Sequence, residues 1–515
     1  MATPSASAGT AAATSATGPG NNLLPLPPKT SILLPSENNI MIPKTQRAIQ
    51  LVGPDQLVLN ESKPVPVPGP FQILGKTEVV GLCFSDLKLL KQFSSHARKS
   101  EVRAGIDPAA LREIPSYVPG EKPTVPGHEA VVRVVAVGDK VKQAKVGGRY
   151  LVQTDYRWLP TASSNAAFGY NFEGALQEYV LMDERVITAP DGESMLIPAP
   201  EDIAASAIAL CEPWACVEDA YVNKQRRTLR DGDIVYHGSN ADAVEKLFAQ
   251  LPANGLMVIC QHGGKFNRPV TVPVGRVHYG NIRIVGTTGD NVEDALAAIP
   301  ATAEIRPHDK INIIGAAGPM GTMHVIRDLC QGVPGVTVFA GDLSDERLTM
   351  LKKLAAPLAA QHQLTLRPYN PSKEKPAEKF TYIVLMAPVP ALVTQAVQDA
   401  GPRAIINIFA GIPADKTAAI DLDTYIAQQA YFVGTSGSTL DDLKAVLRKV
   451  VTRQLDTNLS VAAISGLDGA IDGIRAVEKN LIPGKILVYP DKKGLKLTPL
   501  GDKRWDKRAE EELLK

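Results

Sequence analysis

The sequence contains few cysteines. Its five cysteines are widely separated along 515 residues, and none belongs to a C-x-x-C pair; they are Cys83, Cys211, Cys216, Cys260 and Cys330. Such spacing excludes a disulfide framework and gives no indication of a zinc ribbon or a redox motif. We therefore expect a reducing compartment, the cytoplasm.

An excess of charge of either sign is also absent. The 55 basic residues balance 54 acidic ones, and the formal net charge is +1. This balance gives no electrostatic footprint for nucleic acid or for an anionic membrane. The sequence also lacks the run of about 18 uncharged apolar residues that a membrane span requires. We expect small-molecule partners, and neither a nucleic-acid nor a membrane partner.

The N-terminal segment has little apolar character. It begins "MATPSASAGTAAATSATGPGNN", a low-complexity tract of Ala, Ser, Thr and Gly. It lacks the basic region followed by an apolar region that defines a secretory signal. Because it has little apolar surface to bury, we predict a disordered extension over residues 1–44, with a targeting peptide as the alternative.

The remaining chain is long enough for two or three domains. From Thr45 to about residue 200, short apolar runs are interrupted by Gly and Pro, which is typical of many short strands and tight turns. Residues 45–228 are therefore predicted to form a β-rich domain. After residue 229, apolar runs such as "DIVYHG" and "GVTVFAG" alternate with helical segments, which indicates a parallel α/β sheet.

An internal repeat lies within this α/β region. "VGTTGDNVEDALAAI" at 285–299 matches "VGTSGSTLDDLKAVL" at 433–447 at six positions, with an offset of 148 residues. The match extends upstream through strand, helix and strand in the same order, so duplication explains it better than chance. The predicted segments are an inserted partial α/β repeat at 229–305, a second α/β domain at 306–450, a further segment at 451–500, and a charged tail at 501–515.

A glycine-rich turn follows the apolar strand in "INIIGAAGPMGTMHV". Gly315, Gly318 and Gly321 allow a tight turn, and the helix that follows offers N–H groups to a pyrophosphate, although the spacing is one residue longer than G-x-G-x-x-G. Asp342 ends the next strand, 21 residues past the last glycine, where an acid accepts ribose hydroxyls and repels a 2′-phosphate. We therefore predict NAD as the coenzyme; Arg347 nearby leaves NADP as the alternative.

Candidate metal ligands occur in three separate stretches. "TVPGHEAVV" places His128 and Glu129 before a valine-rich strand, "GLCFSDLK" contains Cys83, and "ALCEPWAC" contains Glu212. An adjacent His-Glu pair alone is more often an ordinary turn. Zinc, however, accepts thiolate, imidazole and carboxylate together, and a catalytic site keeps one position open. We predict one catalytic zinc on Cys83, His128 and Glu129, with Glu212 bound directly or through water.

Such a site would support hydride transfer. Zinc would polarise a carbinol oxygen or a carbonyl while NAD accepts the hydride. Ser85 is predicted to relay the proton, and Asp86 and Glu212 are the other candidate catalytic residues. The alternative is a non-catalytic coenzyme-binding or scaffold protein on the same fold.

The order of these motifs resembles the zinc-dependent medium-chain dehydrogenase/reductase superfamily, in its polyol dehydrogenase branch. The resemblance covers about residues 46–230 and 306–490. It implies a catalytic domain at 45–228 built on a partly open, GroES-like β-barrel, and an NAD-binding Rossmann domain at 306–450, with the active site in the cleft between them. On this basis the repeat at 229–305 is an inserted half-Rossmann repeat, and residues 451–500 return to the catalytic domain. It further implies oxidation or reduction at a secondary alcohol or ketone of a polyol, sugar or sugar phosphate. The matching positions are Cys83, His128 and Glu129 as zinc ligands, Glu212 as the glutamate approaching the metal, Ser85 as the relay hydroxyl, and Gly315, Gly318, Gly321 and Asp342 at the coenzyme.

Three features depart from the family pattern. No cysteine lies between Val152 and Ala175, where many relatives bind a structural zinc, so we predict none here. Lys88 occupies the position at which the proton relay often continues through a histidine. The repeat at 229–305 is foreign to the family plan; we expect it to pack against the coenzyme domain on a surface that relatives use for dimerisation. A homodimer and an inert insertion are the alternatives.

A long segment between Cys83 and His128 carries a basic cluster. Segments of this length near a cleft are often functional, and guanidinium and ammonium groups pair well with a phosphate dianion. The cluster is therefore a candidate phosphate site for a sugar-phosphate substrate, and a solvated face of a surface helix is the alternative. Its members are His96, Arg98, Lys99 and Arg103.

Overall fold

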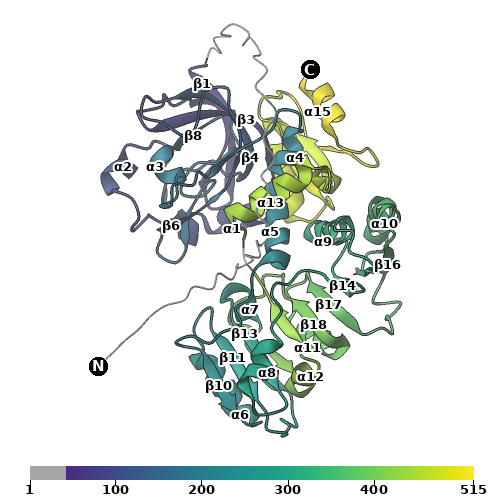
Figure 1. The fold of residues 1–515 in the computed structure, drawn as a ribbon. Coiled ribbons are helices and arrows are strands. Elements are labelled where there is room, and N and C mark those ends of the chain that lie inside the picture. The colour runs from purple at the N-terminus through teal and green to yellow at the C-terminus, as the bar shows by residue number, and fades with distance from the viewer. Residues whose placement is uncertain (1–41, 436) are drawn as a thin grey trace, which may run out of the picture. The chain divides into compact units, whose positions relative to one another are not determined.

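The computed structural model describes residues 42–435 and 437–515 (Figure 1). The first 41 residues of the predicted N-terminal extension lie outside the described residues. Within the described ranges, no helix combines the length and the apolar composition that crossing a membrane requires.

The region predicted to be catalytic, called the catalytic region below, is built on a mixed sheet of eight strands. Its strand β4 (Glu129–Val137) has the sequence EAVVRVVAV, and its β-branched side chains suit a strand buried on both faces. The strand order is β23-β21-β22-β3-β4-β5-β9, and β8 pairs with β3. The other strands are β3 (Gln72–Gly81), β5 (Arg149–Val152), β8 (Tyr179–Asp183), β9 (Leu196–Pro198), β21 (Val461–Ser465), β22 (Lys485–Val488) and β23 (Thr498–Pro499).

Two separate hairpins complete the strands of this region. They are β1 (Thr45–Gly53) with β2 (Gln56–Pro64), and β6 (Asp155–Pro160) with β7 (Asn165–Ala167). The helices are α1 (Phe84–Gln92), α2 (Pro108–Arg112), α3 (Glu184–Ile187), α4 (Ala205–Ala209), α5 (Cys211–Val222), α14 (Leu467–Glu478) and α15 (Lys507–Leu514), and the short 3-10 turns are η1 (Phe93–Ser95), η2 (Ala97–Lys99) and η3 (Thr457–Ser460).

The C-terminal part of the chain joins the catalytic sheet. Strand β22 runs antiparallel to β3 and pairs Leu487 with Gly81, and Gly81 is in turn opposite Glu129 on β4. Helix α15 lies within the predicted charged tail, and its buried Glu510 accepts hydrogen bonds from the Ser206 N–H and the Tyr489 hydroxyl, both at 2.9 Å. Segments more than 350 residues apart in the sequence therefore meet at the ends of β3 and β4.

The coenzyme region is a six-stranded parallel sheet. Its order, β16-β15-β14-β17-β18-β20, is the 3-2-1-4-5-6 order of dinucleotide-binding folds, which confirms the predicted α/β class and the Rossmann sheet. The strands are β14 (Lys310–Ile314), β15 (Thr337–Gly341), β16 (Thr365–Tyr369), β17 (Phe380–Leu385), β18 (Ala400–Asn407) and β20 (Tyr431–Val433), with a short β19 (Ala418–Ile420). The helices are α9 (Pro319–Cys330), α10 (Asp345–Gln361), α11 (Pro390–Asp399), α12 (Leu422–Ala427) and α13 (Leu440–Val451).

The segment 229–305 forms a second, smaller parallel sheet. Its strand order is β10-β11-β13, and its short β12 pairs antiparallel with β19 of the coenzyme region. The elements are β10 (Ile234–His237), α6 (Ala241–Gln250), β11 (Leu256–Cys260), β12 (Val270–Val272), α7 (Gly275–Tyr279), β13 (Arg283–Thr287) and α8 (Val292–Ala297). Most of them are labelled in Figure 1. The order of strands and helices from β10 to β13 is therefore the same as the order from β17 to β20.

Candidate active site

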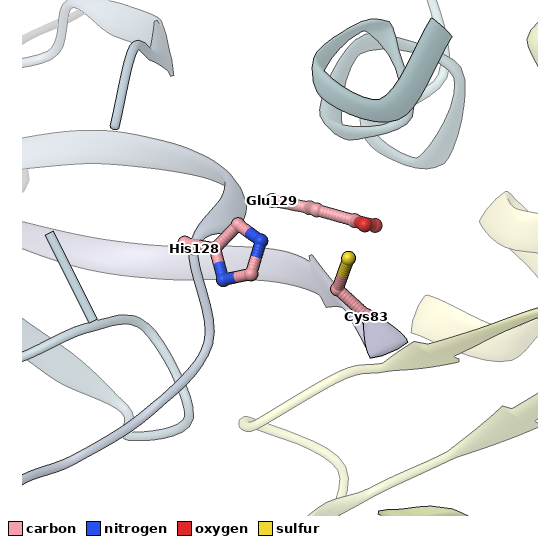
Figure 2. Close-up of side chains that lie close together, drawn as sticks. All are labelled: Cys83, His128 and Glu129. Carbon is pink, nitrogen blue, oxygen red and sulfur yellow. The ribbon is translucent and has the colours of Figure 1, made fainter. Parts of the chain in front are cut away.

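Three side chains with metal-binding atoms converge where β3 ends and β4 begins. Cys83 directly precedes α1, His128 follows Gly127, and Glu129 opens β4. Gly127 has φ +95°, a conformation that favours glycine, so the chain can turn there and present His128. One ligand atom from each of the three side chains lies within 4.8 Å of the other two. Figure 2 shows the three side chains close together. Over the described ranges this is the one such group of three or more residues.

Glu129 is held in place by groups on neighbouring strands. A Cβ atom at Gly81 would lie 2.1 Å from Glu129 Oε2, so the glycine gives this carboxylate its space. Lys485 Nζ donates to Glu129 Oε1 at 2.5 Å and to the Leu82 carbonyl at 2.7 Å. Glu129 Oε2 is buried and has no hydrogen-bond partner. A cation bound by Cys83 and His128 would satisfy that oxygen, so the donor set fits a metal.

The residues after Cys83 orient both ligands. Asp86 Oδ1 lies 3.0 Å from His128 Nδ1, and its Oδ2 accepts a hydrogen bond from the Cys83 N–H at 3.3 Å. When Nδ1 donates to this carboxylate, His128 Nε2 carries the lone pair that a metal needs. Ser85 Oγ is 3.1 Å from Cys83 Sγ and 3.2 Å from Nε2, so its hydroxyl lies at the converging atoms. Asp86 therefore orients Cys83 and His128 through atoms other than their candidate metal-binding atoms.

The buried charges of the site shift one another's pKa. Burial lowers the pKa of His128, but Asp86, Tyr170 and Cys83 together outweigh burial and raise this pKa well above its ordinary value. Burial also opposes the charge of Lys485, yet Glu129 raises the pKa of this ammonium. Lys485 and Glu129 therefore form an ion pair inside the protein.

Glu212 lies near this group without belonging to it. It is buried in the first turn of α5 and is not among the side chains that meet within 4.8 Å. Burial raises its pKa to about 7; His128 opposes this increase and Glu129 adds to it. Near neutral pH such a carboxyl group is only partly ionised. It is therefore better suited to contact a metal through a water molecule than to bind it directly as a permanently charged ligand.

The structure adds two residues that the sequence did not indicate. Lys485 opens β22, in "GKILVYP", where only the start of an apolar strand was visible. The Tyr170 ring lies 5.8 Å from the His128 ring, and burial raises the pKa of this phenol to about 12. No sequence motif pointed to either residue, since both reach the site through tertiary contacts.

The four residues of the basic cluster occupy different environments. Arg98 pairs with Asp155 at 2.6 Å, and its guanidinium lies 5.5 Å from the centre of the Tyr170 ring. Lys99 is fully buried and donates to the backbone carbonyls of Val118 and Lys122. The remaining two are His96, whose ring packs on Tyr170 and accepts from the Arg98 N–H, and Arg103, which is exposed. The structure therefore does not bring the four together; Arg98 and His96 share the Tyr170 side of the site.

The glycine turn has the close packing that a coenzyme loop requires. Gly315 has φ +88°, and a Cβ atom at Gly321 would lie 2.2 Å from the Gly315 carbonyl oxygen. Gly318 caps α9 without a side chain, so the N–H groups of the first turn are free of side-chain caps. Asp342 accepts from the Ala317 N–H at 3.1 Å and from the Ser344 N–H at 3.0 Å. These contacts fit a dinucleotide whose ribose meets Asp342.

A cavity of about 850 Å³ adjoins this turn. Ala317 and Pro319 line it on the side of α9, and Pro483 and Gly484 on the side of the returning segment. Arg347 also lines the cavity and donates to the Asn480 carbonyl at 3.1 Å. The metal-site side chains are not part of its lining.

Known proteins share this organisation. Residues 69–191 match the alcohol dehydrogenase GroES-like domain. The chain is 23% identical to L-sorbose 1-phosphate reductase of Klebsiella pneumoniae, over 89% of the chain and 91% of that protein. It is 29% identical to the uncharacterized protein YggP of Escherichia coli (strain K12), over 36% of the chain but only 46% of that protein. The fold of 2R,3R-butanediol dehydrogenase from Bacillus subtilis covers 87% of the chain and all of that structure, with a TM-score of 0.56 and 18% identity.

The match to a GroES-like domain confirms this part of the predicted fold class, and the matched residues 69–191 include Cys83, His128 and Glu129. The Rossmann sheet follows this domain in the chain, and the fold of butanediol dehydrogenase matches 87% of the chain. Residues 69–191 therefore form an alcohol dehydrogenase GroES-like domain, and the chain as a whole shares the fold of 2R,3R-butanediol dehydrogenase.

Proposed function

We propose that the protein transfers a hydride between NAD(H) and a secondary alcohol or ketone of a polyol, sugar or sugar phosphate. The observation that carries the proposal is the convergence of Cys83, His128 and Glu129, with one Glu129 oxygen buried and unpartnered. These residues would hold one zinc ion, with Glu212 close enough to act through water. When bound, the metal would polarise the substrate oxygen, and the coenzyme would exchange the hydride.

The protein's own residues then position groups and move a proton. Ser85 Oγ lies at the converging donor atoms, and is placed to accept the hydroxyl proton of an alcohol or to return it to a ketone. Asp86 keeps His128 in the required tautomer. His128 and Glu129 are buried and Cys83 is partly buried, so electrostatic interactions within the site are stronger than they would be in water. Lys88, exposed on α1, stands where relatives often continue the relay through a histidine, so no imidazole continues the relay at this position.

Metal content tests the proposal most directly. Elemental analysis of the purified protein is expected to give one zinc per chain, and a panel of polyols and their phosphates should produce an absorbance change of the nicotinamide. The non-catalytic alternative requires a metal-free protein that binds coenzyme without turnover.

The absence of a structural zinc is a further prediction, and two zinc ions per chain would contradict it. The cytoplasmic location stays a prediction as well.

The coenzyme preference is proposed to depend on Asp342. The change Asp342→Asn removes the charge that repels a 2′-phosphate and weakens acceptance of the ribose hydroxyls, so the ratio of kcat/KM for NAD to that for NADP is expected to fall by roughly tenfold to a hundredfold. Asp345→Asn is the matched control, because Asp345 pairs with Lys373 on the surface. An unchanged ratio in the Asp342 variant would assign coenzyme choice to another residue, with Arg347 the first candidate.

The phosphate of a sugar-phosphate substrate is proposed to meet Arg98. The change Arg98→Gln is expected to raise KM for the phosphorylated substrate by roughly tenfold to a hundredfold, because a charge-assisted hydrogen bond contributes about 1.5–3 kcal/mol. KM for the free polyol should change little, and Arg103→Gln should leave both constants unaltered. Equal activity of the native enzyme on a free polyol and on its phosphate would exclude this role.

A further inference from the structure

The two halves of the internal repeat contact each other through equivalent elements. Residues 148 positions apart are equivalent, so strand β13 corresponds to β20. Each is the last strand of its own sheet, and the two strands pack side by side. Helix α7 packs on β20, and its equivalent, α12, packs on β13. The same surface of each half therefore faces the other half.

The pairing of β12 with β19 has the same reciprocal form. The antiparallel pairs are Val270 with Ile420, Thr271 with Ala419, and Val272 with Ala418. The equivalent of Val270 is Ala418, which is the partner of Val272. The exchange is centred on Thr271 and Ala419, which are equivalent and directly opposite. An approximate twofold axis through this pair produces such a register, as in an isologous dimer.

Close packing across the interface repeats in the same way. A Cβ atom at Gly286 would lie 2.7 Å from Ile426 Cγ1, and one at Gly434 would lie 3.0 Å from the Cα atom of His278. Gly286 and Gly434 are equivalent, and so are His278 and Ile426. Apolar side chains from both halves, such as Ile284 and Phe432, belong to one buried cluster.

One equivalent pair at the interface has diverged. Arg283 and Tyr431 occupy the same position in the two halves, and both bind Gln225 Oε1, at 3.1 and 3.0 Å. Arg283 is buried and also donates to the Gly434 carbonyl at 3.0 Å. If two identical 229–305 segments met across this axis, they would bring two buried guanidinium groups to the same place, which is costly. The difference between Arg283 and Tyr431 therefore favours contact between the two different halves over contact between two identical ones.

We propose that residues 229–305 act as a built-in partner subunit, which forms within one chain the self-complementary interface that two copies would otherwise form. The segment covers the edge of β20, so the coenzyme sheet offers no free edge there to a second copy. Its His278 contacts the Ile408 carbonyl at 3.2 Å, at the carboxyl end of β18. The duplication thus covers, within one chain, a sheet edge that a second copy would otherwise cover.

A disulfide across the approximate axis tests the proposal. Thr271 and Ala419 are both exposed, so the full chain with Thr271→Cys and Ala419→Cys should fold, and directly opposed strand residues have a Cα separation that a disulfide can span. After mild oxidation, we expect one disulfide between these positions within a single chain, shown by peptide mapping and by a monomer band on a non-reducing gel. The two single-cysteine variants are the controls and should form no cross-link.

Two results would overturn this assignment. A disulfide-linked dimer from the double variant would mean that residues 229–305 of one chain pack on the coenzyme region of another. Failure of the double variant to cross-link, with the wild-type fold retained by circular dichroism, would mean that β12 and β19 are not paired. Both outcomes are independent of metal content and of activity, so they separate this inference from the proposed function.

Discussion

Replacing Cys83 by alanine is expected to abolish turnover and leave coenzyme binding intact. The thiolate is one of three converging donors, so its loss should reduce bound zinc to below a tenth of an equivalent and remove the charge stabilisation that the metal supplies. That stabilisation amounts to several kcal/mol, which corresponds to a fall in kcat of roughly a thousandfold or more. Elemental analysis, steady-state kinetics and a coenzyme titration by fluorescence measure the three quantities on the same preparation.

The control is a cysteine away from the converging donors. Cys330 lies near the C-terminal end of α9 and is mostly buried. The change Cys330→Ala should retain zinc, turnover and coenzyme affinity, with at most a modest loss of stability from the smaller side chain. Turnover that survives in the Cys83 variant would show that hydride transfer proceeds without this ligand, and the proposed site would then be wrong.

Much of the proposed metal site was visible in the sequence because its candidate ligands lie beside local signals. Gly127 and the valine-rich strand mark the place of His128 and Glu129, and Cys83 follows another apolar strand. The spatial convergence of these stretches depends on the pairing of β3 with β4, which places Gly81 opposite Glu129. Sequence patterns predicted both strands, and the family resemblance supplied their relation.

Lys485 could not be predicted in the same way. It is separated from Glu129 by 356 residues, and it reaches the site because β22 joins the sheet beside β3. Nothing in the local sequence distinguishes it from a surface lysine at the start of a strand. The basic cluster is the converse case, because its four residues are close in sequence. Burial removes Lys99 from the surface, while Arg103 faces solvent.

The repeat was recognisable because the stretches VGTTG at 285–289 and VGTSG at 433–437, together with the strand pattern before them, recur at a constant offset. Its interface was not, since a three-residue pairing such as β12 with β19 leaves no periodic signal in the sequence. Equivalent residues at Gly286 and Gly434 were visible as identities, but their reciprocal contacts with Ile426 and His278 require the structure. Identity between repeats therefore predicted a common fold, and the packing revealed the approximate axis.

Replacing Lys485 by methionine is expected to have the second large effect, on stability as well as on metal binding. The change leaves the Glu129 carboxylate buried without its ammonium partner, and removing one member of a buried ion pair costs about 3–5 kcal/mol. Denaturant unfolding monitored by fluorescence should show this loss in the free energy of unfolding. The loss should be greatest after the metal is removed with a chelator, because a bound cation also compensates Glu129. Lys493→Met, at an exposed lysine, is the matched control.

A second change at Glu129 separates the two roles of this pair. The double variant Lys485→Met with Glu129→Gln contains no unpaired charge, so it should regain most of the stability lost in the single variant. It should still bind little zinc, because the amide is a poor ligand in place of the carboxylate. Recovery of both stability and zinc would mean that Glu129 is not a ligand. Recovery of neither would mean that Lys485 stabilises the protein mainly through its bond to the Leu82 carbonyl.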